Sequence, residues 1–158
     1  MRKIERIFVH ATATPRSHTV EQVLNYFKRV KGWKAPGYHI MIDARGVAVF
    51  TFPLDKIANG VRGYNSTSVH VAWIGGIDAR GKAIDNRTAD QRTALRSVVL
   101  ALKAAFPDAQ LMGHRDISPD INGNGIVDPW ERIKECPCFD VLKEYSDIVQ
   151  LEPEYDKI

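Results

Sequence analysis

The sequence lacks several features that would place the protein in other classes. It has only two cysteines, at positions 136 and 138, which are too few and too close together for a disulfide scaffold. No apolar run approaches the roughly 20 residues that a membrane-spanning helix needs. The apolar stretch within the N-terminal MRKIERIFVHA is short and broken by charge, and we therefore expect no standard signal peptide. These absences favour a globular protein that neither spans a membrane nor depends on disulfides.

The charge pattern argues against nucleic acid as a partner. The net charge is +3, and the lysines and arginines neither form long blocks nor alternate with aromatic residues. Apolar residues make up 44% and charged residues 26% of the 158 positions, which is ordinary for a globular domain with its own core. No exposed apolar stripe stands out, and we expect a monomer.

Hydrophobic periodicity predicts one α/β domain, in which helices flank a central mixed β-sheet. Capping boxes, Thr19 with Gln22 and Thr88 with Gln91, mark the starts of two helices. The predicted strands are residues 4–11, 37–43, 47–52, 68–75 and 110–113, and the predicted helices are residues 19–31, 88–106, 129–135 and 140–149. We expect the domain to span residues 1–150 and to be followed by a polar tail at 151–158.

Two histidines and a cysteine suggest a metal site. His10 and His114 fall at the ends of predicted strands, where side chains can converge beside a sheet. A catalytic zinc ion takes three protein ligands and leaves one position open. A thiolate could come from Cys136 or from Cys138, and their spacing does not decide between them. The alternative is that the cysteine is a small buried apolar residue and the histidines are ordinary ones.

A second metal pattern lies between His114 and the cysteines. Residues 120–131, DINGNGIVDPWE, follow the order of an EF-hand calcium loop, with the turn glycine at Gly125. The predicted calcium ligands are Asp120, Asn122, Asn124, Ile126 through its carbonyl, Asp128 and Glu131. A helix is expected after the loop, but Ile117-Ser118-Pro119 breaks any helix before it. The alternative is a surface turn that holds no ion, with its asparagine side chains capping the local backbone.

Five motifs occur in an order that identifies a family. FVHATAT, GWKAPGYHIMI, GVRGYNSTSVHVAWIGGID, GHRD and KECPCFD together resemble the zinc-dependent N-acetylmuramoyl-L-alanine amidases of the phage-lysozyme type, which are relatives of the peptidoglycan recognition proteins. The resemblance covers roughly residues 4 to 147. It implies an amidase-like or peptidoglycan-recognition-like fold and a substrate in peptidoglycan or its muropeptide fragments.

The resemblance also implies the metal ligands. His10 matches the first zinc histidine of the family and His114 the second. Cys136, in the Lys-x-Cys-Pro-x-Phe-Asp pattern, matches the thiolate ligand. Cys138 falls where the phage enzymes typically have a small polar residue, and we interpret it as a non-ligand.

The implied reaction is hydrolysis of the amide between N-acetylmuramic acid and L-alanine. Zinc would polarise the scissile carbonyl and supply a nucleophilic water. Tyr38 and Lys134 match the catalytic tyrosine and lysine of the family, and either could stabilise the developing negative charge or relay a proton to the leaving amine. Without the motifs, the residue pattern favours a core tyrosine and a solvated lysine.

The sequence departs from the family at two positions near the predicted site. His70 stands in a strand where the phage enzymes have a glycine, and Gly60 stands where they carry a histidine. We expect these changes to affect substrate contacts and not the metal. By strand alternation His39 should point to the sheet face opposite Tyr38 and have a structural role. We assign no role to His18.

The calcium-like loop would be an insertion, because the phage enzymes have a shorter connection there. Glu131 would join the ion to a short helix that carries Lys134, just before Cys136. Our hypothesis is that calcium orders the segment that presents the third zinc ligand and the catalytic lysine.

Two other functions remain open from the sequence. A recognition-like domain could bind muropeptide without cutting it, although the retained Cys136 favours the enzyme. A third possibility is a regulator, because phage amidases of this type can also bind a polymerase. We expect a protein made in the cytoplasm that acts on the cell wall, as a prophage lysin does, or on imported muropeptides.

Overall fold

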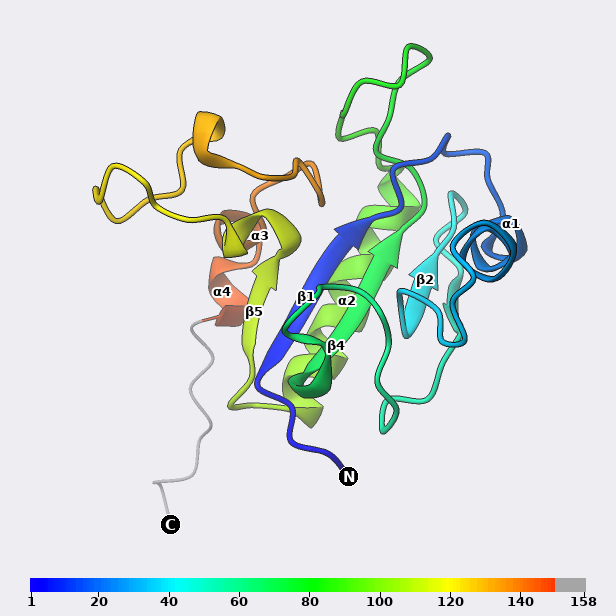
Figure 1. The fold of residues 1–158 in the computed structure, drawn as a ribbon, viewed down its shortest axis with the longest axis horizontal. Coiled ribbons are helices and arrows are strands. Elements are labelled where there is room, and N and C mark those ends of the chain that lie inside the picture. The colour runs from blue at the N-terminus through cyan, green and yellow to red at the C-terminus, as the bar shows by residue number, and fades with distance from the viewer. Residues whose placement is uncertain (150–158) are drawn as a thin grey trace.

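The structure, a computed structural model that describes residues 1–149, is built on a five-stranded mixed sheet with the strand order β3-β2-β4-β1-β5 (Figure 1). β1 pairs in parallel with β4 and with β5, β2 pairs in parallel with β4, and β3 is antiparallel to β2. The strands are β1 (Arg6–Ala11), β2 (Ile40–Ile42), β3 (Ala48–Phe50), β4 (Ser68–Trp73) and β5 (Gln110–Gly113). The predicted α/β architecture is confirmed.

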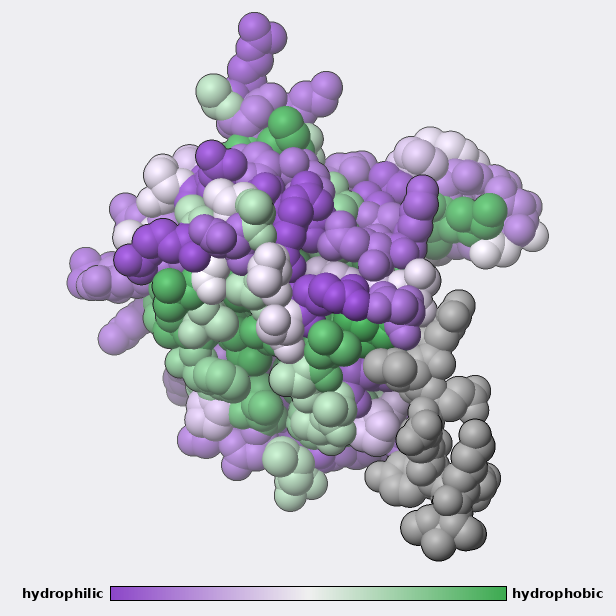
Figure 2. Space-filling view, turned by 180° about the vertical axis from the view of Figure 1, so that it is seen from behind, coloured by the Kyte–Doolittle hydropathy of each residue, from purple (hydrophilic) through white to green (hydrophobic). Residues whose placement is uncertain are grey.

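Helices cover both faces of the sheet, and the central strands are therefore buried on both sides. On one face, alternate residues of β1 and β4 such as Val9 and Val71 join the main core with α2 (Ala89–Ala105), α3 (Val141–Glu144) and α4 (Ser146–Val149). On the other face, α1 (Val20–Asn25) packs over a smaller core. Seen from the α2 side, apolar residues are interspersed with polar ones, and the 120–131 loop projects from the body (Figure 2).

Helix α2 forms as its sequence predicts. Thr88 Oγ1 accepts the Gln91 N–H, and the Gln91 side chain accepts the Thr88 N–H, which completes the capping box. Leu95, Val99 and Leu102 are buried at helical spacing. Gln91 is also buried, and its side-chain amide donates to the Ile74 carbonyl at 2.9 Å. The helix start is thereby fixed to the carboxyl end of β4.

The helix predicted at residues 19–31 is present but changes type. Its capping box at Thr19 is formed, and α1 ends at Asn25. Residues Tyr26–Val30 continue as a π-helix, in which the Lys31 N–H donates to the Tyr26 carbonyl at 3.1 Å. Gly32 ends the helix with a φ of +67°, a conformation that glycine adopts without steric cost.

Several predicted elements are shorter than expected. The predicted hairpin at 37–52 is confirmed, with its turn closed by the Gly46 N–H and the Asp43 carbonyl, but each strand keeps only three residues. The predicted helix at 129–135 is wrong beyond one 3-10 turn, Pro129–Glu131, because the backbone becomes extended at Arg132. The helix predicted at 140–149 begins at its Asp140 cap but breaks into α3 and α4 at Tyr145.

The predicted polar tail at 151–158 lies outside the described residues. Within residues 1–149, no helix is long and apolar enough to cross a membrane.

Candidate active site

Two neighbouring parallel strands bring His10 and His114 together. His10 is near the end of β1, and His114 follows β5 directly, as the first residue of a 3-10 turn. The register places Val9 opposite Gly113, so the next residue of each strand is a histidine. The two imidazole centroids lie 5.1 Å apart, and both side chains are almost completely buried.

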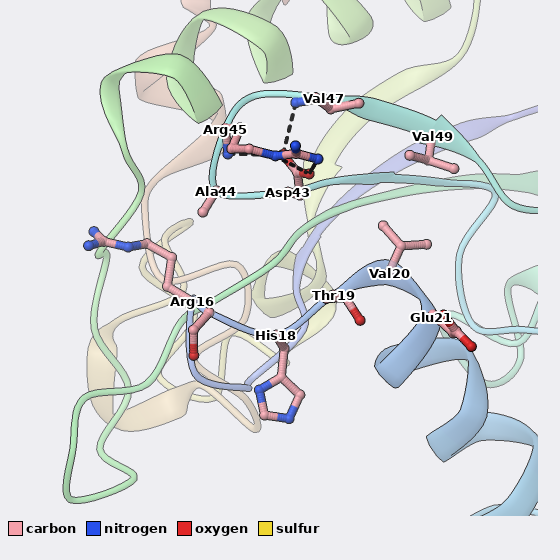
Figure 3. Close-up of a pocket in the computed structure, with 11 residues that line it drawn as sticks. Arg16, His18, Thr19, Val20, Glu21, Asp43, Ala44, Arg45, Val47 and Val49 are labelled. Carbon is pink, nitrogen blue, oxygen red and sulfur yellow. Dashed lines mark hydrogen bonds and ion pairs between the residues drawn. The ribbon is translucent and has the colours of Figure 1, made fainter.

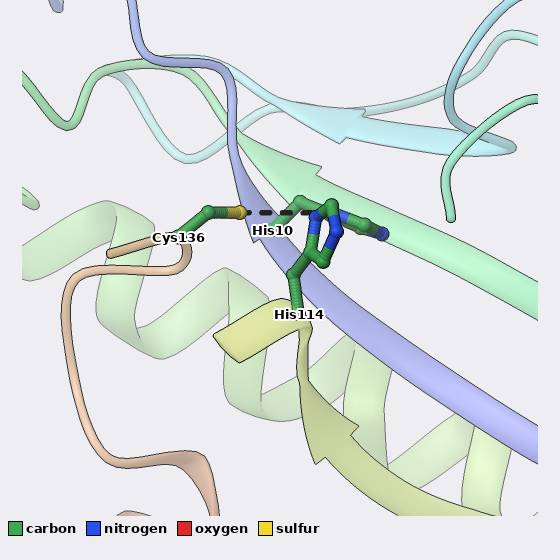
Figure 4. A group of neighbouring side chains, drawn as sticks. All are labelled: His10, His114 and Cys136. Atoms are coloured by element: carbon green, nitrogen blue, oxygen red, sulfur yellow. Dashed lines mark hydrogen bonds between the residues drawn. The ribbon is translucent and has the colours of Figure 1, made fainter. Parts of the chain in front are cut away.

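Cys136 approaches the same point from the segment that follows the 120–131 loop (Figure 4). The Arg115 N–H donates to the Cys136 carbonyl at 2.8 Å, which anchors this segment beside His114. Gly113 permits the approach, because a Cβ there would lie 2.7 Å from Pro137 Cδ. The Cys136 Sγ lies 3.7 Å from His10 Nδ1 and accepts the Ala11 N–H at 3.2 Å.

One potential ligand atom from each of His10, His114 and Cys136 lies within 4.8 Å of the other two. No other group of three His, Cys, Asp or Glu side chains meets this condition in residues 1–149. Cys138 is outside the group, and its Sγ lies 3.6 Å from the Gly76 carbonyl. The structure therefore brings Cys136, and not Cys138, to the two histidines.

Burial sets the protonation of this cluster. It lowers the pKa of His114 to about 4, with a further contribution from the Lys134 charge, and it lowers the pKa of His10 well below its usual value, with further contributions from His70, His114 and Lys134. Both imidazoles are therefore neutral at pH 7, which is the form that binds metals. Burial raises the pKa of the Cys136 thiol to about 12. A thiolate at this position therefore needs a nearby cation.

The three cluster residues line a cleft of about 320 Å³. Tyr38 and Lys134, the predicted catalytic pair, both line this cleft with the three cluster residues. The Tyr38 ring lies 5.0 Å from the His10 ring and 5.4 Å from the Phe27 ring. Burial, together with the neighbouring Cys136, raises the pKa of Tyr38, so its hydroxyl remains a hydrogen-bond donor. Lys134 is exposed and forms no ion pair with any of residues 1–149.

The comparison with known proteins identifies the family. A model of the N-acetylmuramoyl-L-alanine amidase family matches residues 1–137. The chain belongs to this family. The endolysin of Klebsiella phage KP32 is 36% identical over 139 residues, which cover 87% of this chain and 83% of the endolysin. The resemblance stated from the five sequence motifs is thus confirmed.

Solved structures of similar proteins confirm the fold. The Ph2119 endolysin from a Thermus scotoductus bacteriophage superposes with a TM-score of 0.70 at 24% identity, covering 94% of this chain and 86% of that one. Drosophila PGRP-LB superposes with a TM-score of 0.68 at 16% identity, covering 99% of this chain and 88% of that one. The amidase and peptidoglycan-recognition-like fold is therefore shared.

The amidase cleft contains two departures from the sequence predictions. Lys134 was expected on a short helix, but it lies in the extended segment after Glu131. His39 was expected on the sheet face opposite Tyr38, and this is wrong. β2 begins only at Ile40, so strand alternation does not apply to Tyr38, and the His39 ring stacks on that of His70 on the same face. The His39 contacts, with the His70 N–H and the Lys56 carbonyl, agree with a structural role.

His70 is the residue whose contact the sequence prediction missed. Its Nδ1 lies 3.0 Å from His10 Nε2, a contact that the sequence analysis did not predict. In the predicted strands, His10 lies one residue before the end of 4–11 and His70 is the third residue of 68–75, so their positions in the sequence do not pair them. Only the observed register, Phe8 opposite His70, makes that pairing definite.

The 120–131 loop is held together by its own hydrogen bonds. Asp120 accepts the N–H groups of Gly123, Asn124 and Gly125. Glu131 is buried, and its carboxylate accepts the N–H groups of Ile121, Asn122 and Asp128. The side chains of Asn122 and Asn124 both donate to Asp128. These contacts match the local-capping alternative, and calcium binding by the loop stays a prediction.

A second hollow lies away from the cluster, between the start of α1 and the turn of the β2–β3 hairpin (Figure 3). It has a volume of about 570 Å³, and its lining includes Arg16, His18, Asp43 and Arg45. Asp43 is already paired with Arg45 at 2.8 Å. None of the predicted catalytic or metal-binding residues lines this hollow.

Proposed function

We propose that the protein is a zinc-dependent hydrolase that cleaves the amide between N-acetylmuramic acid and L-alanine in peptidoglycan. The observation that carries this proposal is the convergence of His10, His114 and Cys136 in a protein of the amidase family. The endolysin name of its phage relative also supports a peptidoglycan substrate.

The three residues fit zinc. Two neutral imidazoles and one thiolate form a ligand set that zinc accepts and that leaves one position open for substrate chemistry. The buried Cys136 thiol has a raised pKa, so a divalent cation would favour its ionised form. Zinc bound there would polarise the scissile carbonyl and make water a better nucleophile near neutral pH.

The other residues of the cleft supply charge and hydrogen bonds. The Tyr38 ring lies 5.0 Å from that of His10, and its hydroxyl is protonated, so it can donate to an oxygen that gains negative charge. Lys134 brings a positive charge to the opening of the same cleft. In hydrolysis, a proton must also reach the leaving amine of L-alanine, and we assign its delivery to one of these two side chains because both line the cleft.

The experiment that tests the proposal is a measurement of metal content and of amidase activity in three proteins. The wild type should bind about one zinc ion per chain and release muropeptides with a free N-terminal alanine. The Cys136→Ser variant should lose both the zinc and the activity. The matched control is Cys138→Ser, which should keep both because Cys138 is outside the cluster.

One result would replace this proposal with the non-catalytic alternative. If the folded wild type binds muropeptide but takes up no zinc after reconstitution and cleaves nothing, the protein is a binding module. Cys136 would then be a buried thiol.

A monomeric state, the 1–150 domain boundary and a polymerase partner stay predictions.

A further inference from the structure

A third histidine side chain, that of His70, contacts the cluster of His10, His114 and Cys136 without being part of it. His70 is completely buried in β4, next to β1. Its Nδ1 lies 3.0 Å from Nε2 of His10. The other nitrogen of His10, Nδ1, lies toward Cys136, 3.7 Å from Sγ. His10 therefore connects the cluster on one side of its ring to His70 on the other.

The surrounding residues fix the His70 ring. It stacks between Phe8, at 5.6 Å and 10°, and His39, at 5.8 Å and 5°. His39 Nδ1 accepts the His70 backbone N–H at 3.0 Å. These contacts fix the plane of the His70 ring, and its Nδ1 edge faces His10.

Gly60 closes the last side of this contact. A Cβ at position 60 would lie 2.3 Å from His70 Nδ1 and 2.4 Å from its Cγ. Gly60 also lines the cleft, whereas His70 does not. A side chain at position 60 would therefore occupy the space that the His70 imidazole fills. The two departures noted in the sequence, a glycine at 60 and a histidine at 70, are thus sterically coupled.

The chemistry of the ring nitrogens determines which histidine donates the hydrogen bond between His10 and His70. A nitrogen that binds a metal must offer a lone pair, so a neutral His10 that binds through Nδ1 carries its proton on Nε2. That Nε2–H points at His70 Nδ1, which must then accept it. His70 in turn carries its own proton on Nε2, an atom that is buried and has no hydrogen-bond partner among residues 1–149.

We propose that His70 is a positioning residue that accepts the Nε2–H of His10 and thereby holds His10 with Nδ1 toward the zinc ion. This inference rests on the zinc site proposed above. Outer partners of this kind fix the tautomer and orientation of a ligand histidine, and their loss typically weakens metal binding by about 10- to 100-fold. The buried, unpaired His70 Nε2 indicates that this residue is not there for stability alone.

Three substitutions at position 70 separate positioning from packing. In His70→Asn the side-chain Oδ1, bonded to Cγ as Nδ1 is, can still accept from His10. His70→Leu keeps a similar volume but has no acceptor. His70→Gly removes the ring, and adding Gly60→His returns an imidazole to the same space from the other position.

The measurement is zinc affinity by competition with a chelator, together with the melting temperature of each zinc-free protein and nitrogen NMR of the imidazoles. We expect His70→Leu to bind zinc about 10- to 100-fold more weakly without a lower zinc-free melting temperature. His70→Asn should remain within about threefold of the wild type, by retaining the acceptor. The Gly60→His/His70→Gly protein should bind zinc more tightly than His70→Gly. In the zinc-loaded wild type, His10 should carry its proton on Nε2.

Equal zinc affinity of the wild type and His70→Leu would overturn the inference, as would a zinc-bound His10 with its proton on Nδ1. If His70→Leu fails to fold, the comparison of His70→Gly with the double variant decides, and equal affinity of those two overturns the inference. A wild type that binds zinc but cleaves no peptidoglycan contradicts only the proposed activity. A wild type that binds no zinc overturns both proposals.

Discussion

Two buried polar clusters lie on opposite faces of the same sheet and are built on opposite principles. On the α2 face, the Arg87 side chain is 0% exposed and donates to Asp85 at 2.8 Å and to Glu144 at 2.7 Å, while its guanidinium lies 3.5 Å from the centre of the Phe139 ring. On the α1 face, His10, His114 and Cys136 meet with no carboxylate in their group.

The clusters differ in whether the protein itself supplies the opposite charge that each one needs. Arg87 has carboxylates on two sides, so its charge and its donors are satisfied within the protein, and such a cluster serves the structure. The histidine and cysteine cluster offers lone pairs and an ionisable thiol but no cation within the group to complete it. A buried set of ligands that lacks its positive charge is what a metal site requires.

The largest expected effect comes from a substitution beside the cluster of His10, His114 and Cys136. Tyr38→Phe should lower kcat by about 10²- to 10³-fold while zinc content stays unchanged, because it removes a donor to the developing negative charge. Tyr26→Phe is the matched control, since Tyr26 lines the same cleft. Steady-state kinetics on a soluble muropeptide measures the effect. Parallel measurement of Lys134→Met and its pH profile would show which of the two side chains delivers the proton.

An unchanged kcat in Tyr38→Phe would contradict its catalytic role. A loss of zinc in that variant would instead make Tyr38 a structural support of the cluster.

Substitution in the cluster of Arg87, Asp85 and Glu144 should lower the stability of the fold and leave the catalytic activity unchanged. Arg87→Met should lower the free energy of unfolding by roughly 2–3 kcal/mol, less than the loss of one partner from a fully buried pair, because Asp85 and Glu144 stay partly solvated. Urea denaturation of zinc-free protein measures this. Arg96→Met is the control, since the pair of Arg96 with Asp147 is exposed on the surface. Equal losses of unfolding free energy in Arg87→Met and Arg96→Met would mean that the Arg87 cluster stabilises the fold no more than a surface ion pair does.

The pH dependence of stability should sharpen the same contrast. Hydrogen bonds from Arg87 lower the pKa of Glu144, and although burial alone would raise the pKa of Asp85, its contacts with Arg87 lower it overall. Carboxyl groups with a lowered pKa stabilise the fold above their unfolded pKa of about 4, and this contribution is lost as the pH falls through the folded pKa. The stability difference between the wild type and Arg87→Met should therefore shrink between about pH 5 and pH 2. A difference that is constant over this range would contradict the assignment.

The smallest expected effect concerns the 120–131 loop. If the loop binds calcium, calcium at about ten times its dissociation constant should stabilise the wild type by about 1.4 kcal/mol, and the gain should be absent in Asp120→Asn. Magnesium serves as the control cation. Thermal melts of zinc-loaded protein measure the effect. No shift with calcium would leave the loop as a surface turn held by its own side chains.

The sequence predicted the sheet, the two main helices and the meeting of His10 with His114, because these follow from alternation, capping boxes and strand ends. It could not give the strand register, and the contact of His70 with His10 depends on that register. The expectation that His39 and Tyr38 lie on opposite faces failed because β2 begins at Ile40, three residues after the predicted start, so strand alternation does not apply to Tyr38. The helix expected to carry Lys134 is absent because the backbone becomes extended after Glu131, and this extended segment brings Cys136 to the histidines.

The position of the two ligand histidines also bears on how the protein folds. His10 and His114 come from opposite parts of the chain and meet only when β1 has paired with β5. Closing a loop of roughly 100 residues is a slow, non-local step, and the three side chains of the proposed zinc site cannot bind an ion together before it is complete. Metal binding at the proposed site should thus be one of the last events in folding, and its rate would report when the sheet has assembled.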